Sequence, residues 1–503
     1  MKLAPTVTDS IEITDRKIGA QMLGLDIRKN MALHVLAGGR PTEIARVNQV
    51  SRKFVYGQST IARQAIDSVF NRMPVDEERV LFHIPVTKSL IRQIVLVLLL
   101  RCHASYRGVI AFFGDLFGYN ISLGTIHNIV AAVVSKAETV TTSVNLMNAK
   151  TGCHDEIYQA GKPVLVGIDA RSTYCYLLAA AEHADGETWG CELLDLIARG
   201  LCLDTVVADL GSGLRRGQEL AMPNVPCFAD IFHVFRDMSD IFRYYERKHA
   251  GAVTSRKSLD DKMASLELRG KKRTRHSRSL GAARAREKSL SELITSLQIL
   301  FDWMRNDVLT LAGAGFDERS ITFDFIITEL RLQESERGKL ISLRKRLENH
   351  KDELLGFAKK LDYQLDKVAM THKVPKDLLQ RLCIALGMNE SDINRYRIES
   401  DIWLLVGSRL HDIRTDVEQL LASTVRASSL VEMTNSILRS YFFLRRQAGA
   451  EYLKLLQFYL NHRVLKESER PERIGKSPRE ILSGESHAHW LELLGFIRLQ
   501  PCA

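Results

Sequence analysis

Apolar and polar positions follow three different patterns along the chain. Over residues 1–150, apolar side chains recur every three or four positions, which is the spacing of amphipathic helices. From about 160 to 240, short apolar runs rich in Val, Leu, Tyr and Cys indicate strands that alternate with helices. From about 240 to 425 the strand pattern disappears, and long charged amphipathic helices take over. We therefore expect a mixed α/β region with helical regions on both sides.

Two pairs of helices in the first region have the outline of a helix-turn-helix, whose second helix can read DNA. Residues 40–70 predict a helix, a short polar break and a second helix that opens at Ser51. Over 105–140, Gly118 is expected to end one helix and Ser122 to cap the next. Such pairs occur in any helical domain, but two of them ahead of an α/β region favour DNA binding. The expected DNA contacts of the first pair are Arg52, Lys53, Tyr56 and Gln58.

The central region predicts three strands as a meander, then a helix, a strand, a helix and a strand. "PVLVGIDA" (163–170) and "TYCYLLAAAEH" (173–183) are predicted strands, and "ADGE" (184–187) is a predicted hairpin turn. "TWGCELLDLIARGL" is expected to start as the third strand and to end as a helix. The runs 204–214 and 225–238 each supply a further buried strand, ending at Asp209 and Asp230.

The segment 269–288 carries nine Lys or Arg residues against one Glu. Such a run is commonly a solvated hairpin between helices. A block of nearly one sign that also contains Gly and Ser is equally what a loop that grips DNA phosphates looks like. We favour DNA contact, with the expected residues Lys271, Lys272, Arg273 and Arg275.

Composition adds bounds on the class of protein. A length of 503 residues predicts several domains, and a net charge of +10 mildly favours a polyanionic partner. The N-terminus lacks the apolar core of a secretory signal, and the longest apolar run, "IVLVLLL" (94–100), is too short to span a bilayer. Eight scattered cysteines without a C-x-x-C pair argue against a structural zinc site or a disulfide framework. The expectation is a cytoplasmic protein without a membrane partner.

Two carboxylates at strand ends are the first candidates for chemistry. Asp169 and Asp209 each end an apolar strand, and in a meander followed by a crossover the two strands can lie side by side. Neighbouring carboxylates repel one another, and Mg²⁺, which prefers oxygen ligands, relieves that repulsion. A pair of such ions can align the attacking and leaving oxygens of a phosphoryl transfer.

A third carboxylate is expected from "SSLVEMTNSILR" (428–439), where Ser428 or Ser429 caps a helix and Glu432 lies in its first turn. Asn435 and Arg439 follow at spacings that place them on the same stripe of the helix. A glutamate at a helix start commonly just complements the helix dipole. The stripe, together with two strand-end aspartates, favours a metal ligand over that explanation.

Three further residues remain as alternatives. Glu451 is a rival to Glu432, but it lacks the neighbouring Asn and Arg. Asp230 and His233 in "ADIFHVF" are expected either as accessory residues of the site or as a helix-capping Asp with a packed His.

The segments "VGIDA", "VVADLGSG" and "LVEMTNSILR" together resemble the catalytic core of bacterial insertion-sequence transposases of the DDE type. The resemblance covers about 160–240 and 425–485, including the tail "NHR…IGKSPREIL". It implies a ribonuclease-H-like core in which Asp169, Asp209 and Glu432 hold two Mg²⁺ ions, which Mn²⁺ could replace. Arg439 matches the Lys or Arg that many members carry seven residues after the Glu. The 223 positions between Asp209 and Glu432 imply a large helical insertion.

The resemblance also implies hydrolysis at transposon ends, strand transfer into target DNA, and assembly as a dimer or higher oligomer in the bacterial nucleoid. The expected domain plan is 1–75 and 76–150 as helix-turn-helix regions, 160–240 as the first part of the core, 241–425 as the insertion, and 426–503 as the closing helix and tail. Two alternatives stay open. One is a ribonuclease-H-like DNA nuclease without strand transfer, and the other is a non-catalytic, sequence-specific DNA-binding protein.

Overall fold

The computed structural model of the chain describes residues 23–70, 84–272, 274–334, 338–426, 429–444, 449–468 and 470–498. The chain forms two compact units, one made of residues 1–85 with 500–503 and the other of residues 86–499. Each unit is described by itself below. Among the described residues, no helix combines the length and the apolar character that crossing a bilayer requires.

The first unit contains three helices in its described part: α1 (Leu25–Leu36), α2 (Pro41–Val47) and α3 (Arg52–Phe70). Its small core is formed by Met31, Ile44, Val50 and Val55. The two helices expected over 40–70 are confirmed, because Pro41 opens α2 and the break before α3 ends at Ser51. The hydroxyl of Ser51 accepts a hydrogen bond from the backbone N–H of Phe54 at 3.2 Å.

The second unit is built on a mixed sheet of five strands in the order β3-β2-β1-β4-β5. Strand β1 is antiparallel to β2 and parallel to β4, β2 is antiparallel to β3, and β4 is parallel to β5. The expectation of a mixed sheet flanked by helices is therefore confirmed. The strands are β1 (Thr151–Gln159), β2 (Lys162–Asp169), β3 (Cys175–Ala180), β4 (Thr205–Ala208) and β5 (Cys227–Ala229).

Two details of the predicted meander are wrong. Its first strand is β1, which the sequence did not indicate because polar residues stand at many of its positions. The "ADGE" segment is not a hairpin turn, since Asp185 is the N-cap of a helix and accepts a hydrogen bond from Thr188 N at 2.9 Å. The residues "TWGC" consequently belong to α7 (Gly186–Ala198) and not to a strand.

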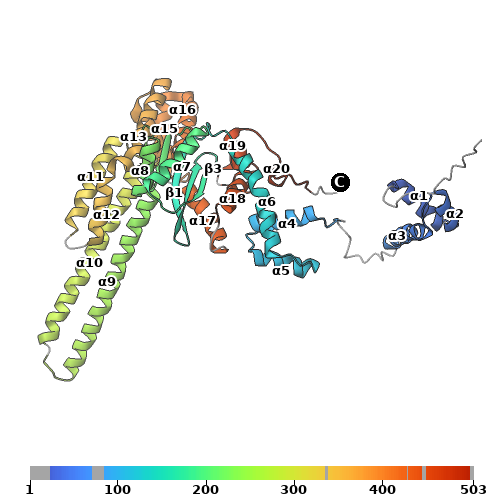
Figure 1. The fold of residues 1–503 in the computed structure, drawn as a ribbon. Coiled ribbons are helices and arrows are strands. Elements are labelled where there is room, and N and C mark those ends of the chain that lie inside the picture. The colour runs from blue at the N-terminus through green and yellow to red at the C-terminus, as the bar shows by residue number, and fades with distance from the viewer. Residues whose placement is uncertain are drawn as a thin grey trace, which may run out of the picture. The chain divides into compact units, whose positions relative to one another are not determined.

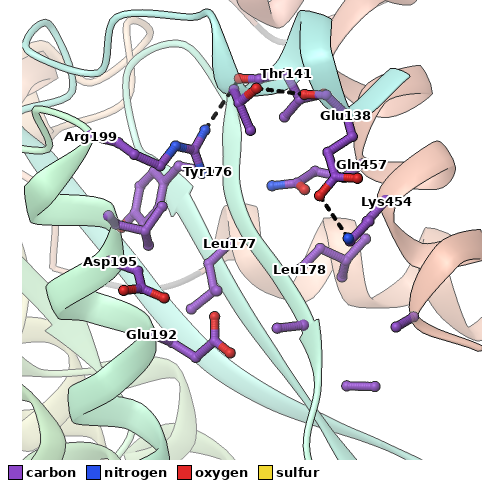
Figure 2. A pocket seen from close by; sticks show the side chains of 15 residues that line it. Glu138, Thr141, Tyr176, Leu177, Leu178, Glu192, Asp195, Arg199, Lys454 and Gln457 are labelled. Carbon is purple, nitrogen blue, oxygen red and sulfur yellow. Dashed lines mark hydrogen bonds and ion pairs between the residues drawn. The ribbon is translucent and has the colours of Figure 1, made fainter. Parts of the chain in front are cut away.

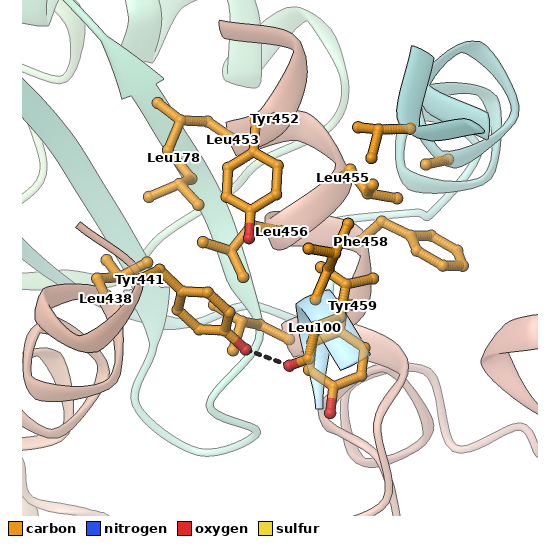
Figure 3. Packing of buried hydrophobic residues seen from close by; sticks show 14 of the residues in the cluster. Leu100, Leu178, Leu438, Tyr441, Tyr452, Leu453, Leu455, Leu456, Phe458 and Tyr459 are labelled. Carbon is orange, nitrogen blue, oxygen red and sulfur yellow. Dashed lines mark hydrogen bonds between the residues drawn. The ribbon is translucent and has the colours of Figure 1, made fainter. Parts of the chain in front are cut away.

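Helices cover both faces of the sheet. On one face, Cys153 and Val166 pack in a core cluster with residues of α4 (Lys88–Leu100), α5 (Tyr106–Phe117), α6 (Leu123–Thr142), α17 (Ser429–Leu444) and α18 (Ala450–His462). Figure 3 shows Tyr441 of α17 in this cluster, with its hydroxyl donating a hydrogen bond to the Leu100 carbonyl. On the other face, Leu165 and Val206 pack with residues of α7 and α8 (Ser212–Ala221).

The caps expected for the second helix pair are confirmed. Gly118 ends α5 in the left-handed conformation, with a φ of 58°. Ser122 caps α6 and accepts a hydrogen bond from Thr125 N at 3.1 Å. Both helices pack into the core of the second unit.

Between β5 and α17, every element that the structure describes is helical. Figure 1 shows α9 and α10 as a long hairpin that projects from the sheet, with the other helices beside its base. The elements are α9 (Ile231–Leu268), α10 (Thr274–Trp303), the π-helical turn Met304–Val308, α11 (Phe316–Leu332), α12 (Gly338–Asn349), α13 (Lys351–His372), α14 (Lys376–Gly387), α15 (Ile393–Val406), the 3-10 turn Gly407–Arg409 and α16 (Leu410–Ser423). After α18 follow the 3-10 turn Pro471–Arg473, α19 (Pro478–Ser483) and α20 (Trp490–Leu493).

The basic segment 269–288 is mostly helix and not one long loop. Only residues 269–273 lie between α9 and α10, and 274–288 form the first turns of α10. The reason is local, since this stretch is rich in Ala and Arg, which favour helix. Lys271 and Lys272 are exposed in the turn, Arg275 is exposed on α10, and Arg273 lies outside the described residues.

Candidate metal centre

Three side chains that can ligate a metal meet where β1, β4 and α9 come together. One ligand atom from each of Asp155, Asp209 and His233 lies within 4.8 Å of the others. The register explains the meeting, because His154 of β1 pairs with Ala208 of the parallel strand β4. The residues that follow, Asp155 and Asp209, are therefore at the same level of the sheet.

Asp155 is a buried carboxylate with two fixed hydrogen bonds. Its Oδ1 accepts from the backbone N–H of Glu156 at 2.8 Å, and its Oδ2 accepts from Asn435 Nδ2 at 2.7 Å. Burial raises the pKa of Asp155 to about 6, and the charges of Glu432 and Asp209 act in the same direction, against His233 and the Glu156 hydrogen bond. The site thus concentrates negative charge that a cation would relieve.

Asp209 is held by the loop that follows β4 and by Arg215 of α8. The backbone N–H of Gly211 donates a hydrogen bond to Asp209 Oδ1. The guanidinium of Arg215 donates to three carbonyl groups, those of Asp209 (2.9 Å), Cys227 (2.8 Å) and Ala208 (3.3 Å). Arg215 therefore ties the end of β4 to the start of β5, and so fixes the backbone from which Asp209 projects.

His233 is oriented by Asp230, which is fully buried. One carboxylate oxygen of Asp230 caps α9 by accepting from Phe232 N at 2.8 Å, and the other lies 2.8 Å from His233 Nδ1. Burial alone would lower the pKa of His233, but the hydrogen bond and charge of Asp230, with the charges of Asp155 and Asp209, raise it overall. Asp230 thus caps a helix, and His233 faces the other two side chains of the cluster.

Helix α17 brings Glu432 and Asn435 to the same place. Glu432 Oε1 lies 3.8 Å from His233 Nε2, and Glu432 Oε2 lies 3.5 Å from the guanidinium of Arg439. Asn435 is buried against Asp155, as its hydrogen bond shows. Glu451 lies elsewhere, on α18, where it lines a cavity together with residues of α5 and α6.

The structure does not bring Asp169 to Asp209. In the antiparallel register of β1 and β2, Asp169 stands opposite Gly152, three positions before Asp155. At roughly 3.3 Å per residue this is a separation of about 10 Å along the strand. Asp169 instead fixes a turn, since its oxygens accept hydrogen bonds from Ser172 N (2.8 Å), Ser172 Oγ (2.6 Å) and Lys150 N (3.2 Å).

Sequence reasoning missed Asp155 because β1 does not look like a buried strand. "TGCHDEIYQ" carries His, Asp, Glu and Gln, although most of its positions are buried. One signal was present, since Cys153, Asp155 and Ile157 alternate onto one face, and Ala160 and Gly161 form the tight turn into β2. The predicted DNA contacts on α3 lie in the first unit, where Arg52, Lys53 and Tyr56 are exposed and Gln58 is half-buried.

Comparisons with known proteins show only a distant structural similarity. No family model and no curated protein matches the sequence. Among solved structures, the Drosophila P element transposase strand transfer complex aligns with a TM-score of 0.28 and 11% identity, over 70% of this chain and 100% of that chain.

Proposed function

We propose that this chain is a metal-dependent DNA phosphoryl transferase of the DDE transposase type, with Asp155, Asp209 and Glu432 as its three carboxylates. The observation that carries the proposal is the convergence of Asp155, in the middle of β1, with Asp209, directly after the end of the parallel strand β4, beside α17. The antiparallel meander β3-β2-β1, followed by the parallel strands β4 and β5, supports a ribonuclease-H-like core. In this proposal Asp155 takes the place that the sequence assigned to Asp169.

The donor set fits a hard divalent cation. Asp155, Asp209 and Glu432 offer carboxylate oxygens, which Mg²⁺ prefers and Mn²⁺ also accepts, and His233 adds a nitrogen within reach. Burial, and to a smaller extent the charges of Glu432 and Asp209, raise the pKa of Asp155, so its ionised form is costly without a cation. When bound there, such an ion would activate water and offset the charge that develops on a phosphate during in-line displacement.

The protein's own residues orient the centre. Asn435 fixes the Asp155 carboxylate, Arg215 fixes the backbone at Asp209, and Asp230 fixes the His233 ring. With Nδ1 of His233 turned toward Asp230, Nε2 is the ring nitrogen that faces Glu432 and the centre.

DNA recognition is proposed for the first unit and for the tip of the α9–α10 hairpin. The pair α2 and α3 supports a helix-turn-helix that reads terminal repeats, with Arg52, Lys53, Tyr56 and Gln58 at the start of its second helix. Lys271, Lys272 and Arg275 are proposed to contact DNA phosphates, in keeping with the net charge of +10. Assembly as a dimer or higher oligomer on paired ends belongs to the same proposal.

A cleavage assay with matched variants tests the function. The substrates are duplexes taken from the DNA on either side of the coding sequence, incubated with Mg²⁺ or Mn²⁺. We expect Asp155→Asn, Asp209→Asn and Glu432→Gln to abolish cleavage, while Glu451→Gln, which changes an exposed glutamate away from the centre, leaves it intact. If the wild-type protein binds these duplexes but never cuts them, a non-catalytic DNA-binding protein is the better reading.

Strand transfer is tested separately with ends that have already been cut. Joining of a pre-cut 3′-hydroxyl end to a plasmid supports a transposase. Cleavage without any joining favours the nuclease alternative.

A further inference from the structure

A second cavity lies at the end of the sheet where β1 begins and β2 ends. It has a volume of about 340 Å³, and its walls include Lys150, Asp169, Arg171, Ser423 and Arg470. A water molecule in the liquid takes roughly 30 Å³, so the cavity has room for about ten waters or for a phosphate group with its neighbouring sugar. Its residues play no part in the candidate metal centre.

The three cations of this cavity have no carboxylate partner among the described residues. Each donates only to a backbone carbonyl: Lys150 Nζ to Cys202 at 3.5 Å, Arg171 Nη2 to Ile481 at 3.3 Å, and Arg470 Nη2 to Ala422 at 3.2 Å. Guanidinium and ammonium groups left in this state keep free N–H donors for an anion.

Two residues, Asp169 and Arg473, hold the turn that carries Arg171 into the wall of the cavity. Asp169 uses both carboxylate oxygens to hold the turn that carries Arg171, through Ser172 and the backbone of Lys150. Arg473 lies behind this turn, 5% exposed, and donates to the carbonyls of Ala170 (3.0 Å) and Arg171 (2.7 Å). Burial and then the charge of Arg470 lower the pKa of Arg473, while Glu472 and Asp169 act against this. The positive charge at this end of the sheet is thus concentrated and only partly offset.

The larger cavity of about 630 Å³ beside β3 offers a contrast. Figure 2 shows its Lys454 paired with Glu138 at 2.6 Å, and its Arg199 donating to the Thr141 carbonyl at 3.2 Å. Glu192 and Asp195 add two further carboxylates. That cavity therefore has no excess of positive charge, and its electrostatics do not favour the binding of an anion.

We propose that the cavity of Lys150, Arg171 and Arg470 binds a backbone phosphate of the DNA strand that the candidate metal centre acts on. This proposal rests on the proposed function. The cavity lies about 10 Å along the sheet from the centre, since Asp169 of β2 pairs with Gly152, three positions before Asp155 on β1. The odd spacing turns the two carboxylates to opposite faces, so the DNA strand would pass around the end of the sheet where β1 begins. A strand of DNA advances about 3.4 Å per nucleotide along its axis, so a phosphate at least three nucleotides from the reacting one can span this distance. Arg171 and Arg470 would grip the phosphate as forked donors, and Lys150 as a point charge.

The test is DNA binding in EDTA, where no cleavage can occur, measured by fluorescence anisotropy of a labelled duplex at several salt concentrations. The double variant Arg171→Gln with Arg470→Gln is compared with a control that also removes two positive charges, Lys162→Gln with Arg216→Gln. Both control residues are exposed and already paired with glutamates. Melting temperatures of all variants verify that they are folded.

We expect the double variant to bind about tenfold more weakly and to lower the slope of log K against log salt by about 0.9, the value for one lost phosphate. The variant Arg171→Lys with Arg470→Lys keeps the charge and should retain most of the slope, which a purely structural role of the arginines would not predict. Equal slopes for the wild type, the double variant and the control overturn the proposal, as does a wild type that does not bind DNA.

Two further measurements distinguish this proposal from a site for free phosphate and from the proposed metal-dependent function. If calorimetry shows that inorganic phosphate binds the wild type but not the double variant, while the DNA slope is unchanged, the ligand is a free phosphate and the DNA assignment is overturned. Metal-dependent cleavage with an unchanged slope leaves the proposed function standing without this pocket. If the salt slope changes in the double variant, the phosphate site is supported. If the Asp155→Asn variant also still cuts DNA, the proposed metal centre is overturned.

Discussion

The substitution Asp155→Asn should stabilise the metal-free protein at high pH, although it removes a residue proposed to be essential. Burial is the main reason that the pKa of Asp155 rises from its usual 3.8 to about 6. A raised carboxyl pKa means that the folded protein binds this proton more tightly than the unfolded chain does. The stability from the protonated group is therefore complete below the unfolded pKa and is lost as the pH rises through about 6.

The magnitude follows from the shift. Just over two pKa units at 1.36 kcal/mol each give about 3 kcal/mol, which the ionised Asp155 costs the folded protein above pH 6. An amide carries no such cost. Its hydrogen bonds can also be kept, because Asn435 Oδ1 is buried and has no hydrogen-bond partner among the residues that the structure describes. A turn of the Asn435 amide would present that oxygen to the new N–H. We expect Asp155→Asn to be more stable by roughly 2–3 kcal/mol at pH 8, and equal to the wild type near pH 4.

The assay is urea unfolding in EDTA at pH 8, 6 and 4, repeated at pH 8 with Mg²⁺ in excess. Because an ion that binds only the folded state stabilises it, Mg²⁺ should raise the unfolding midpoint of the wild type but not that of Asp155→Asn. Asp169→Asn is the matched control. It should be less stable at each of these pH values by about 1–3 kcal/mol, since the three hydrogen bonds to its carboxylate need both oxygens, and it should keep the response to Mg²⁺. Identical midpoints for Asp155→Asn and the wild type at pH 8, with no response to Mg²⁺, would refute the reasoning.

Three further predictions concern the rest of the second unit. Burial lowers the pKa of His154 to about 3 and that of His462 to about 4, so below pH 6.5 the unfolded chain binds more protons than the folded protein does. The free energy of unfolding in urea should therefore decrease as the pH is lowered, by about 1.4 kcal/mol per pH unit for each histidine, and less steeply in His462→Leu. Gly217→Ala would overlap Trp189 where α8 meets α7 and should cost about 1–3 kcal/mol in urea unfolding, while Gly251→Ala, with open space around it in α9, should gain about 0.5–1 kcal/mol. Arg215→Lys should lower Mg²⁺-dependent cleavage about 10- to 100-fold, because Asp209 is displaced when the guanidinium no longer holds its backbone. Cleavage at the wild-type rate would show that the hydrogen bonds of Arg215 are not needed.

Local signals predicted the helices and several strands well. Gly118 and Ser122 end and begin helices as expected, because a left-handed glycine and a capping hydroxyl act within a few residues. The strands around "PVLVGIDA" and "DTVVADLGSG" were visible because they are apolar and buried. Segments whose character depends on partners far along the chain were not: β1 is polar in sequence and is buried only because β2 and β4 lie on either side of it.

The error over Asp169 has the same origin. Its place at the end of an apolar strand is a local fact, but which strand ends meet depends on the direction of pairing. Because β1 runs antiparallel to β2 and parallel to β4, the end of β2 lies beside the start of β1, and the end of β4 lies beside His154 and Asp155. The stripe of Glu432 and Asn435 was visible because helix periodicity is local, and the structure places both residues at the centre.

The hydrogen bond between Asn435 and Asp155 joins residues 280 positions apart, and this separation determines how long a ribosome takes to make the second residue after the first. A ribosome that adds 5–20 residues per second needs roughly 14 to 56 s to make that interval. For most of it, the growing chain already contains β1 and β4 but not α17, so Asp155 and Asp209 have neither Asn435 nor Glu432 beside them. For a protein proposed to cut DNA, the helices between β5 and α17 thus delay assembly of the proposed centre, and a chain that stops within them lacks its third carboxylate.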